Sequence, residues 1–156
     1  MKTNDHPGVY VPPPLIYVAF YGLAWMVQSV LPMNSRIIHS ATFHNFGWLL
    51  LILSFGITIP GLWKFRQTKN SLVPIKPAHS LQTDGIYAYT RNPMYLGLLL
   101  LYSGISCLTG NYWALFLLPF LIFILQSYVI RREEKYLERA FDKDYVAYRS
   151  RVRRWI

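Results

Sequence analysis

Charged residues are missing from three long stretches of this chain, and that segregation limits its fold more than any other feature. No Lys, Arg, Asp or Glu occurs in residues 6–35, 37–63 or 92–130 of the 156. A helix needs about 20 apolar residues to cross the ~30 Å hydrocarbon layer of a membrane, and these stretches hold four runs near that length. The runs are Leu15–Leu31, Phe43–Trp63, Pro93–Thr109 and Tyr112–Ile130. The pattern predicts an all-α, polytopic membrane protein with about four transmembrane helices.

Proline and glycine mark where these helices are expected to begin, bend and end. Residues 12–14 are all Pro, which no helix tolerates internally, so the first span should follow them. Gly110-Asn111 joins the last two runs and predicts a tight helical hairpin. Pro60 is expected to weaken the last turn of the second span, and Pro119 to kink the fourth.

The C-terminal segment, Arg131–Ile156, has a different composition and carries nine of the sixteen basic residues. Apolar and aromatic residues recur in it every three or four positions, as they do on one face of a helix. They are Leu137, Phe141, Tyr145, Tyr148, Val152 and Trp155. Because the opposite face is charged, such a helix lies on the membrane surface or folds back over the mouth of the bundle.

The distribution of basic residues predicts the orientation in the membrane. With four spans, both termini and the connection 64–91 lie on the same side, and that side holds fifteen of the sixteen basic residues. Only Arg36 lies opposite. The positive-inside rule makes the basic side cytoplasmic, in a bacterial inner membrane or its equivalent. The same rule explains the net charge of +9 without a nucleic-acid partner, and nothing in the sequence indicates an obligate protein partner.

Several common chemistries leave no signature in the sequence. There is no G-x-G-x-x-G motif and no P-loop, which argues against a soluble nucleotide-binding fold. No Cys and His spacing resembles a zinc site, and His39 and His44 are expected on the far side, so no metal is predicted. The single cysteine, Cys107, excludes an intramolecular disulfide.

The polar segment Leu81–Gly97 is where chemistry is expected. Asp84-Gly85 is a turn signal, and Asn92-Pro93 is typical of a helix start, with Asn92 able to cap free N–H groups. Since the last two spans form an antiparallel hairpin, the start of one lies near the end of the other. Glu133 and Glu134, just beyond the fourth span, should therefore approach Arg91, Asn92 and Tyr95.

A structural interpretation of the same residues is open. Arg91, Arg131 and Arg132 fit the role of interfacial anchors, and Asn92 that of a helix cap. Tyr87 and Tyr95 fit the aromatic belt of a membrane protein. Gly97 and Gly104 are expected to allow close helix packing rather than to contact a ligand.

Two segments, within about residues 72–155, resemble the isoprenylcysteine carboxyl methyltransferase family, and the phospholipid N-methyltransferases are similar in the same region. The first runs Gly85-Ile86-Tyr87, then Arg91-Asn92-Pro93-Met94-Tyr95-Leu96-Gly97. The second is Glu133-Glu134, followed by Leu137, Phe141, Tyr145, Tyr148 and Val152. The family's pattern has His where this chain has Asn92.

The resemblance implies a membrane methyltransferase that binds S-adenosylmethionine at the cytoplasmic face and takes a lipophilic substrate from the bilayer. The residues that fall on cofactor-contact positions of the family are His79, Ser80, Leu81, Gln82, Tyr87, Asn92, Pro93, Met94, Tyr95 and Glu133. Catalytic roles are expected for Arg91, Arg131, Glu133 and Glu134. A carboxylate acceptor would be held by Arg91 or Arg131, preferably in a two-point fork.

Several functions are consistent with the sequence. The domain is expected to span residues 1–156, with two spans in residues 15–63 and the cofactor-binding half in residues 72–156. The methyl acceptor is open among a prenylated cysteine carboxylate, a phospholipid amine and a lipophilic thiol. A small membrane reductase of the sterol-reductase kind, using NADPH, is the alternative enzyme. A membrane protein without catalytic activity is the third hypothesis.

Overall fold

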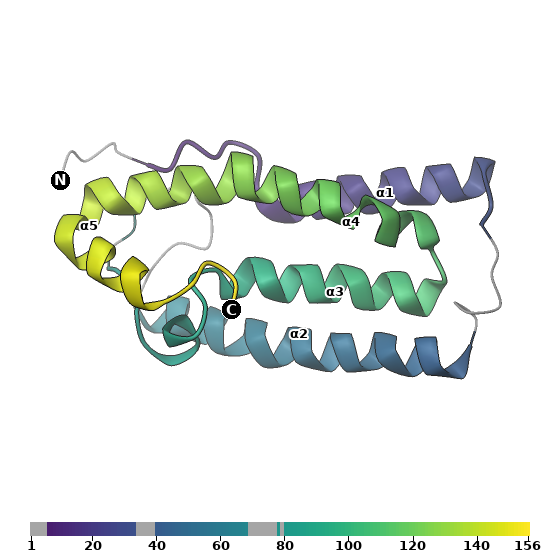
Figure 1. Cartoon of the computed structure of the whole chain (residues 1–156), viewed down its shortest axis with the longest axis horizontal. Coiled ribbons are helices and arrows are strands. Elements are labelled where there is room, and N and C mark those ends of the chain that lie inside the picture. The colour runs from purple at the N-terminus through teal and green to yellow at the C-terminus, as the bar shows by residue number, and fades with distance from the viewer. Residues whose placement is uncertain (1–5, 34–39, 69–77, 79) are drawn as a thin grey trace.

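The computed structural model describes residues 6–33, 40–68, 78 and 80–156, and these residues form helices and connecting segments without a strand (Figure 1). The α-helices are α1 (Pro13–Val30), α2 (Ala41–Gln67), α3 (Pro93–Thr109), α4 (Tyr112–Ile124) and α5 (Arg131–Arg151). A 3-10 turn, η1, covers Gly85–Ala88, and a π-helix, η2, covers Leu125–Ile130. The predicted all-α fold is confirmed.

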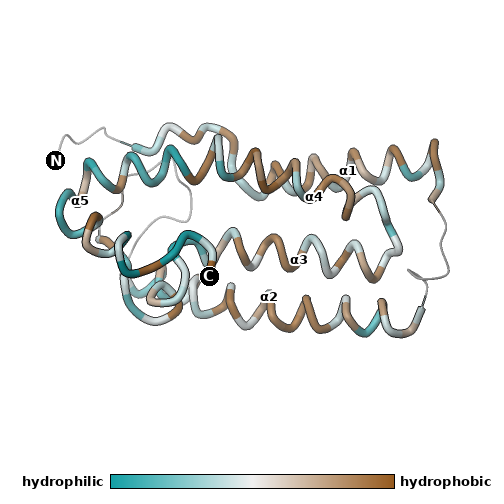
Figure 2. The backbone as a smooth tube through the Cα atoms, in the orientation of Figure 1, coloured by the Kyte–Doolittle hydropathy of each residue, from teal (hydrophilic) through white to brown (hydrophobic). Residues whose placement is uncertain are grey.

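The helices run side by side, and most are built to cross a membrane. α1, α2 and the continuous helix Tyr112–Arg151 are each long and apolar enough to span it, and α3 is a shorter apolar helix. Residues 112–130 form the charge-free part of the longest helix, so α5 lies beyond the span. Figure 2 shows the brown helical bundle and a teal end made of α5 and the connection before α3. This supports the prediction of a polytopic membrane protein.

Small residues let α2 and α3 pack closely. A Cβ atom on Gly97 would lie 2.0 Å from Oγ1 of Thr58, and one on Gly104 would lie 3.0 Å from the backbone oxygen of Gly47. Oγ of Ser54 donates a hydrogen bond to the carbonyl of Gly97 at 2.7 Å, which satisfies a buried hydroxyl in the apolar layer. The two glycines thus serve helix packing, as the sequence indicated.

The predicted hairpin between α3 and α4 is confirmed. Gly110 ends α3 with φ of 66°, the left-handed conformation that glycine adopts without strain. Oδ1 of Asn111 then accepts the backbone N–H of Ala114 at 3.2 Å and caps α4. The reversal returns the chain to the same end of the bundle at which α3 began.

Helix boundaries differ from the predicted ones around proline. α1 begins at Pro13, two residues before the predicted span, because proline fits the first helical turn. α2 continues through Pro60 to Gln67, and α4 passes Pro119 without a break. The departure from α-geometry comes later, in the π-helix η2. A proline removes one hydrogen bond, whereas an interrupted helix would leave several backbone groups unpaired in lipid.

The C-terminal helix turns back on itself, so the predicted stripe is not one straight helix. Asp142 has φ of 42° and ψ of −117°, which breaks the helical path inside α5. After this kink the chain reverses towards the start of α3 (Figure 1). Tyr145 and Tyr148 are buried as a result, and α5 covers the mouth of the bundle as expected.

Candidate active site

A cavity of about 440 Å³ opens at the end of the bundle where α2 ends and α3 begins. Its volume lies within the roughly 300–1,000 Å³ of pockets that hold small-molecule ligands. The polar wall comes from the connection before α3 and from α5. The apolar wall comes from α1, α2 and α3, through Pro13, Pro14, Thr58, Leu62, Phe65, Met94 and Leu98.

A second cavity, of about 520 Å³, lies at the opposite end of the bundle. Among the residues that line it are Trp25, Gln28, Thr109 and Asn111, and none of its lining residues is charged. The concentration of ionisable groups therefore singles out the cavity beside α5 as the candidate active site.

The start of α3 forms one side of this cavity. Asn92 occupies the capping position and Pro93 the first helical position, and both are buried. The side chain of Asn92 makes no capping hydrogen bond, so the capping hypothesis is wrong. Its amide Nδ2 instead donates to the backbone carbonyl of Arg154 at 2.9 Å. Asn92 thereby ties the C-terminal segment to the helix start.

Glu133 reaches the cavity from α5. Its Oε1 accepts a hydrogen bond from the hydroxyl of Tyr95 at 2.5 Å. Burial raises the pKa of Glu133 to about 7; the Tyr95 bond opposes the shift, and the negative charge of Glu134 adds to it. A cation bound next to this carboxylate would stabilise its ionised form and lower its pKa.

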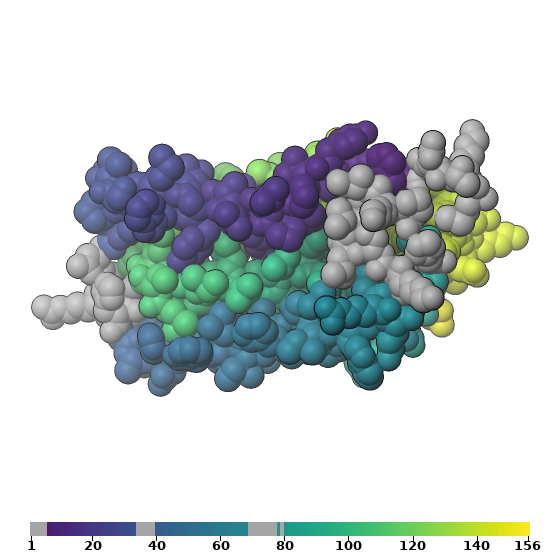
Figure 3. Space-filling view, turned by 180° about the vertical axis from the view of Figure 1, so that it is seen from behind, coloured from purple at the N-terminus to yellow at the C-terminus, as the bar shows by residue number. Residues whose placement is uncertain are grey.

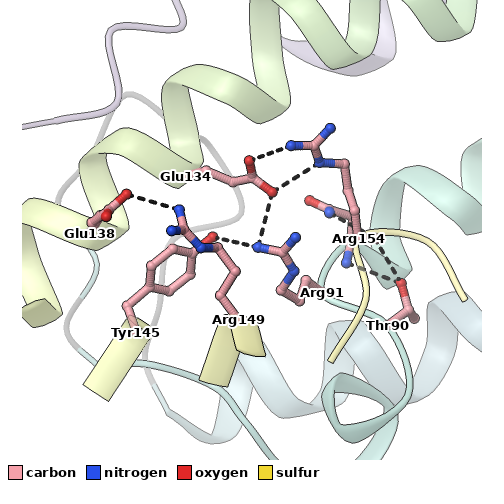
Figure 4. A network of polar contacts seen from close by, with 8 residues as sticks. Thr90, Arg91, Glu134, Glu138, Tyr145, Arg149 and Arg154 are labelled. Atoms are coloured by element: carbon pink, nitrogen blue, oxygen red, sulfur yellow. Dashed lines mark hydrogen bonds and ion pairs between the residues drawn. The ribbon is translucent and has the colours of Figure 1, made fainter. Parts of the chain in front are cut away.

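Glu134 is the centre of a network with two arginines (Figure 4). Its Oε1 lies 3.1 Å from Nη1 of Arg91, which also donates to the hydroxyl of Tyr145 at 3.1 Å. Arg154 approaches from the other side, with Nε and Nη2 at 3.0 and 2.7 Å from the two carboxylate oxygens. Nε of Arg91 is buried and has no hydrogen-bond partner among the described residues.

Tyrosines of α5 fix the polar connection over the cavity. The hydroxyl of Tyr136 accepts the backbone N–H of Ala78 at 2.8 Å. The hydroxyl of Tyr148 donates to the carbonyl of Tyr87 at 2.6 Å, and the ring of Tyr87 packs on Phe65 of α2. Ala78 is therefore held by α5, and Tyr87 is held by both α5 and α2.

The structure brings together most of the residues that the sequence selected. Those that line the cavity are Ser80, Leu81, Gln82, Tyr87, Arg91, Asn92, Pro93, Met94, Tyr95, Glu133 and Glu134. Arg131 is exposed and does not line it, because it precedes Glu133 by two residues, about 200° around the helix. His79 lies outside the described residues.

Arg132 is exposed and contacts the N-terminal segment, not the cavity. Its Nη1 donates to the carbonyl of Gly8 at 2.8 Å, and its guanidinium lies over the ring of Tyr128 at 4.6 Å. Its role as an interfacial anchor stays a prediction.

Sequence reasoning missed several side chains of the site, among them Tyr136, Tyr145, Tyr148 and Arg154. Tyr145 and Tyr148 lay on the recognised helical stripe, but nothing indicated that the stripe bends back into the cavity. Arg154 gave no signal, since it is one of nine basic residues in the C-terminal segment. Its position depends on the reversal at Asp142, which carries the chain back to Glu134.

Fold and cavity together define a helical membrane protein with a ligand-sized, ionisable pocket at one end of its bundle. The chain belongs to the phospholipid methyltransferase family, whose model matches residues 42–144. This confirms the predicted resemblance and extends it into α2.

Two yeast proteins are similar to part of this chain. The chain is 39% identical over 74 residues to a Schizosaccharomyces pombe protein named Protein-S-isoprenylcysteine O-methyltransferase, and 35% identical over 74 residues to the Saccharomyces cerevisiae protein of that name. Each match covers 47% of this chain and 31% of the yeast protein, so the chain spans about a third of these relatives.

A bacterial relative matches over its full length. An uncharacterized protein of Haemophilus influenzae is 38% identical over 63 residues, which is 40% of this chain and 100% of that protein. No solved structure matches the chain.

Proposed function

We propose that this protein is an S-adenosylmethionine-dependent methyltransferase that modifies a lipophilic carboxylic acid of the prenylcysteine type. One observation carries the proposal. The same cavity has an ionisable wall, with Arg91, Glu133 and Glu134, and an apolar wall formed by residues of α1, α2 and α3. Membership of the phospholipid methyltransferase family and the names of the yeast relatives support the reaction class.

The residues present fit the cofactor. Glu133 lies on the cavity wall, burial raises its pKa, and as a carboxylate it would hold the cofactor's ammonium group. The first turn of α3, at Pro93, would favour the cofactor's carboxylate, since the positive end of a helix dipole attracts anions. Tyr87 and Tyr148 offer aromatic surface. Bound S-adenosylmethionine would supply the electrophilic methyl group.

The apolar wall fits the hydrocarbon part of an acceptor. Pro13 and Pro14 at the start of α1 line the cavity together with Leu62 and Phe65 of α2. Figure 3 shows α3 between α1 and α2 on the face seen from behind. An acceptor whose hydrocarbon chain lies along this apolar wall would bring its polar head to the ionisable wall.

The charges of the site favour an anionic head group. Arg91 and Arg154 share the single carboxylate of Glu134, so this network has one positive charge in excess. The buried Nε of Arg91 has no hydrogen-bond partner within the part of the chain that the structure describes, and an unsatisfied buried donor costs about 1–3 kcal/mol. An acceptor carboxylate would accept a hydrogen bond from this nitrogen, whereas the ammonium of a phospholipid amine would meet a cation.

Methyl transfer to a carboxylate requires the protein to align the two reactants and does not require it to transfer a proton. A carboxylate is already ionised at neutral pH and needs no general base. Arg91 would hold that carboxylate, and the connection pinned by Tyr136 and Tyr148 would keep water away from it. Fixing two reactants in line supplies a large part of the rate of such displacements. The excess of basic residues at this end supports a reaction on the cytoplasmic side.

Methyl transfer in lipid nanodiscs tests the proposal. Radiolabelled S-adenosylmethionine is offered with S-farnesylcysteine, its methyl ester, farnesyl thiol and phosphatidylethanolamine. We expect label on the free acid alone, and Arg91→Gln should lower the rate about ten- to a hundredfold, as expected for a lost bond to a charged group. Arg132→Gln, which changes an exposed arginine outside the cavity, is the matched control. Label on phosphatidylethanolamine would show that the acceptor is an amine and not a carboxylate. No label on any acceptor would refute the proposed methyltransferase activity.

A further inference from the structure

The last residues of the chain return to the start of α3 and are fixed there by three hydrogen bonds. The backbone N–H of Arg91 donates to the carbonyl of Arg153 at 3.1 Å. The carbonyl of Arg154 accepts from Oγ1 of Thr90 at 3.3 Å and from Nδ2 of Asn92 at 2.9 Å. Consecutive residues on both sides are thus paired, which sets the position of the Arg154 backbone relative to the cavity.

The side chain of Arg154 is held as firmly as its backbone. Its two nitrogens bind both oxygens of Glu134, a planar fork that is geometrically more selective than a single contact. The Glu134 side chain is 13% exposed and that of Arg91 is 10% exposed. The carboxylate is therefore shared between two guanidinium groups in a poorly solvated place, where charges act strongly on one another.

The exposed ion pair between Arg149 and Glu138 in the same region serves as a comparison for the contact between Arg154 and Glu134. Arg149 meets Glu138 through one contact of 3.1 Å, and both side chains are more than 40% exposed (Figure 4). Exposed pairs of this kind contribute little to stability. Arg154 differs in its fork geometry, in the burial of its partner and in the paired backbone beneath it.

The consequence concerns the charge that Arg91 presents to the cavity. Arg91 already contacts Glu134, and these two residues alone would form a neutral pair. Arg154 binds both oxygens of the same carboxylate, so the three side chains together carry one positive charge. We infer that Arg154 is a positioning residue that holds Glu134 and offsets its negative charge, so that Arg91 can attract the acceptor carboxylate; this inference rests on the proposed function.

Calorimetry on protein saturated with S-adenosylhomocysteine tests the inference without requiring turnover. S-Farnesylcysteine and its methyl ester are titrated into wild type, Arg154→Gln, Arg154→Lys and Arg149→Gln, and the melting temperature of each is recorded. We expect Arg154→Gln to weaken binding of the acid about tenfold while the ester and S-adenosylhomocysteine bind as before. Arg154→Lys should recover part of the loss, since it restores charge but not the fork. Arg149→Gln should behave as wild type.

Each other outcome decides against a specific claim. Equal binding of the acid by wild type and Arg154→Gln overturns the positioning role, even if wild type transfers methyl groups. A parallel loss for acid, ester and S-adenosylhomocysteine, with a lower melting temperature, assigns Arg154 a structural role only. Selective loss of acid binding in a protein that transfers no methyl group supports the positioning role and refutes the proposed function. A wild type that binds the acid no better than the ester overturns the inference.

Discussion

At the scale of single residues, Glu133 makes cofactor binding depend on pH. Burial raises its pKa to about 7, whereas binding of an ammonium group requires the ionised form. Affinity for S-adenosylhomocysteine should therefore fall as the pH drops below 7, approaching about tenfold per pH unit. Glu133→Gln mimics the neutral form and should bind weakly and independently of pH. Calorimetry between about pH 5.5 and 8.5 measures both.

The same residue gives a stability effect of the opposite sign. Because its pKa is raised on folding, Glu133 stabilises the folded protein most at low pH, and that contribution is lost as the pH rises through about 7. The melting temperature of wild type should accordingly fall relative to that of Glu133→Gln over this range. A difference between the two proteins that does not change with pH would contradict the raised pKa.

Asn92 offers a second test at this scale. Its amide donates to the carbonyl of Arg154, so Asn92→Asp removes the donor and sets a carboxylate against a carbonyl. We expect a loss of about 1–3 kcal/mol in stability. Asn92→His, which installs the residue of the resembling family, keeps a ring N–H donor and should lose less. Thermal unfolding of both variants measures the effect, and a fully stable Asn92→Asp would show that this hydrogen bond is unimportant.

At the scale of elements, the reversal inside α5 stores backbone strain. Asp142 has φ of 42° and ψ of −117°, close to the first central position of a type II′ turn, which glycine prefers. Asp142→Gly should stabilise the protein by about 1 kcal/mol. The matched control is Asp144→Gly, two residues on in regular helix, which should destabilise it by a similar amount. Changes in stability of opposite sign for the two variants, measured by thermal unfolding, would support backbone strain at Asp142. Equal losses of stability would contradict it.

The elements that sequence reasoning predicted well are those set by local chemistry. Charge-free runs of membrane length and the Gly110-Asn111 turn fixed the spans and the hairpin, because lipid leaves the backbone few alternatives. The same hairpin placed Glu133 and Glu134 beside Arg91. The reversal at Asp142 was not predictable, since an aspartate in this conformation follows from tertiary contacts of α5. Arg154 was missed as a consequence.

At the scale of the whole molecule, the placement of both termini at the basic end is the main prediction about topology. The native Cys107 is buried, so an introduced cysteine can be labelled against little background. A membrane-impermeant maleimide added to intact cells should react with Met33→Cys and not with Ser150→Cys. Both positions are exposed in the fold, so accessibility alone does not separate them. The reverse pattern would invert the orientation and place the cavity on the outer side.

The central claim is that the cavity beside α5 binds S-adenosylmethionine, and binding of S-adenosylhomocysteine to purified protein at one neutral pH tests it most directly. Wild type should bind, and Glu133→Gln should bind about ten- to a hundredfold more weakly. Lys135→Gln, which changes an exposed residue of the same helix, should bind as wild type. NADPH is titrated in parallel. No binding of S-adenosylhomocysteine, with tight binding of NADPH, would contradict the claim and identify a reductase.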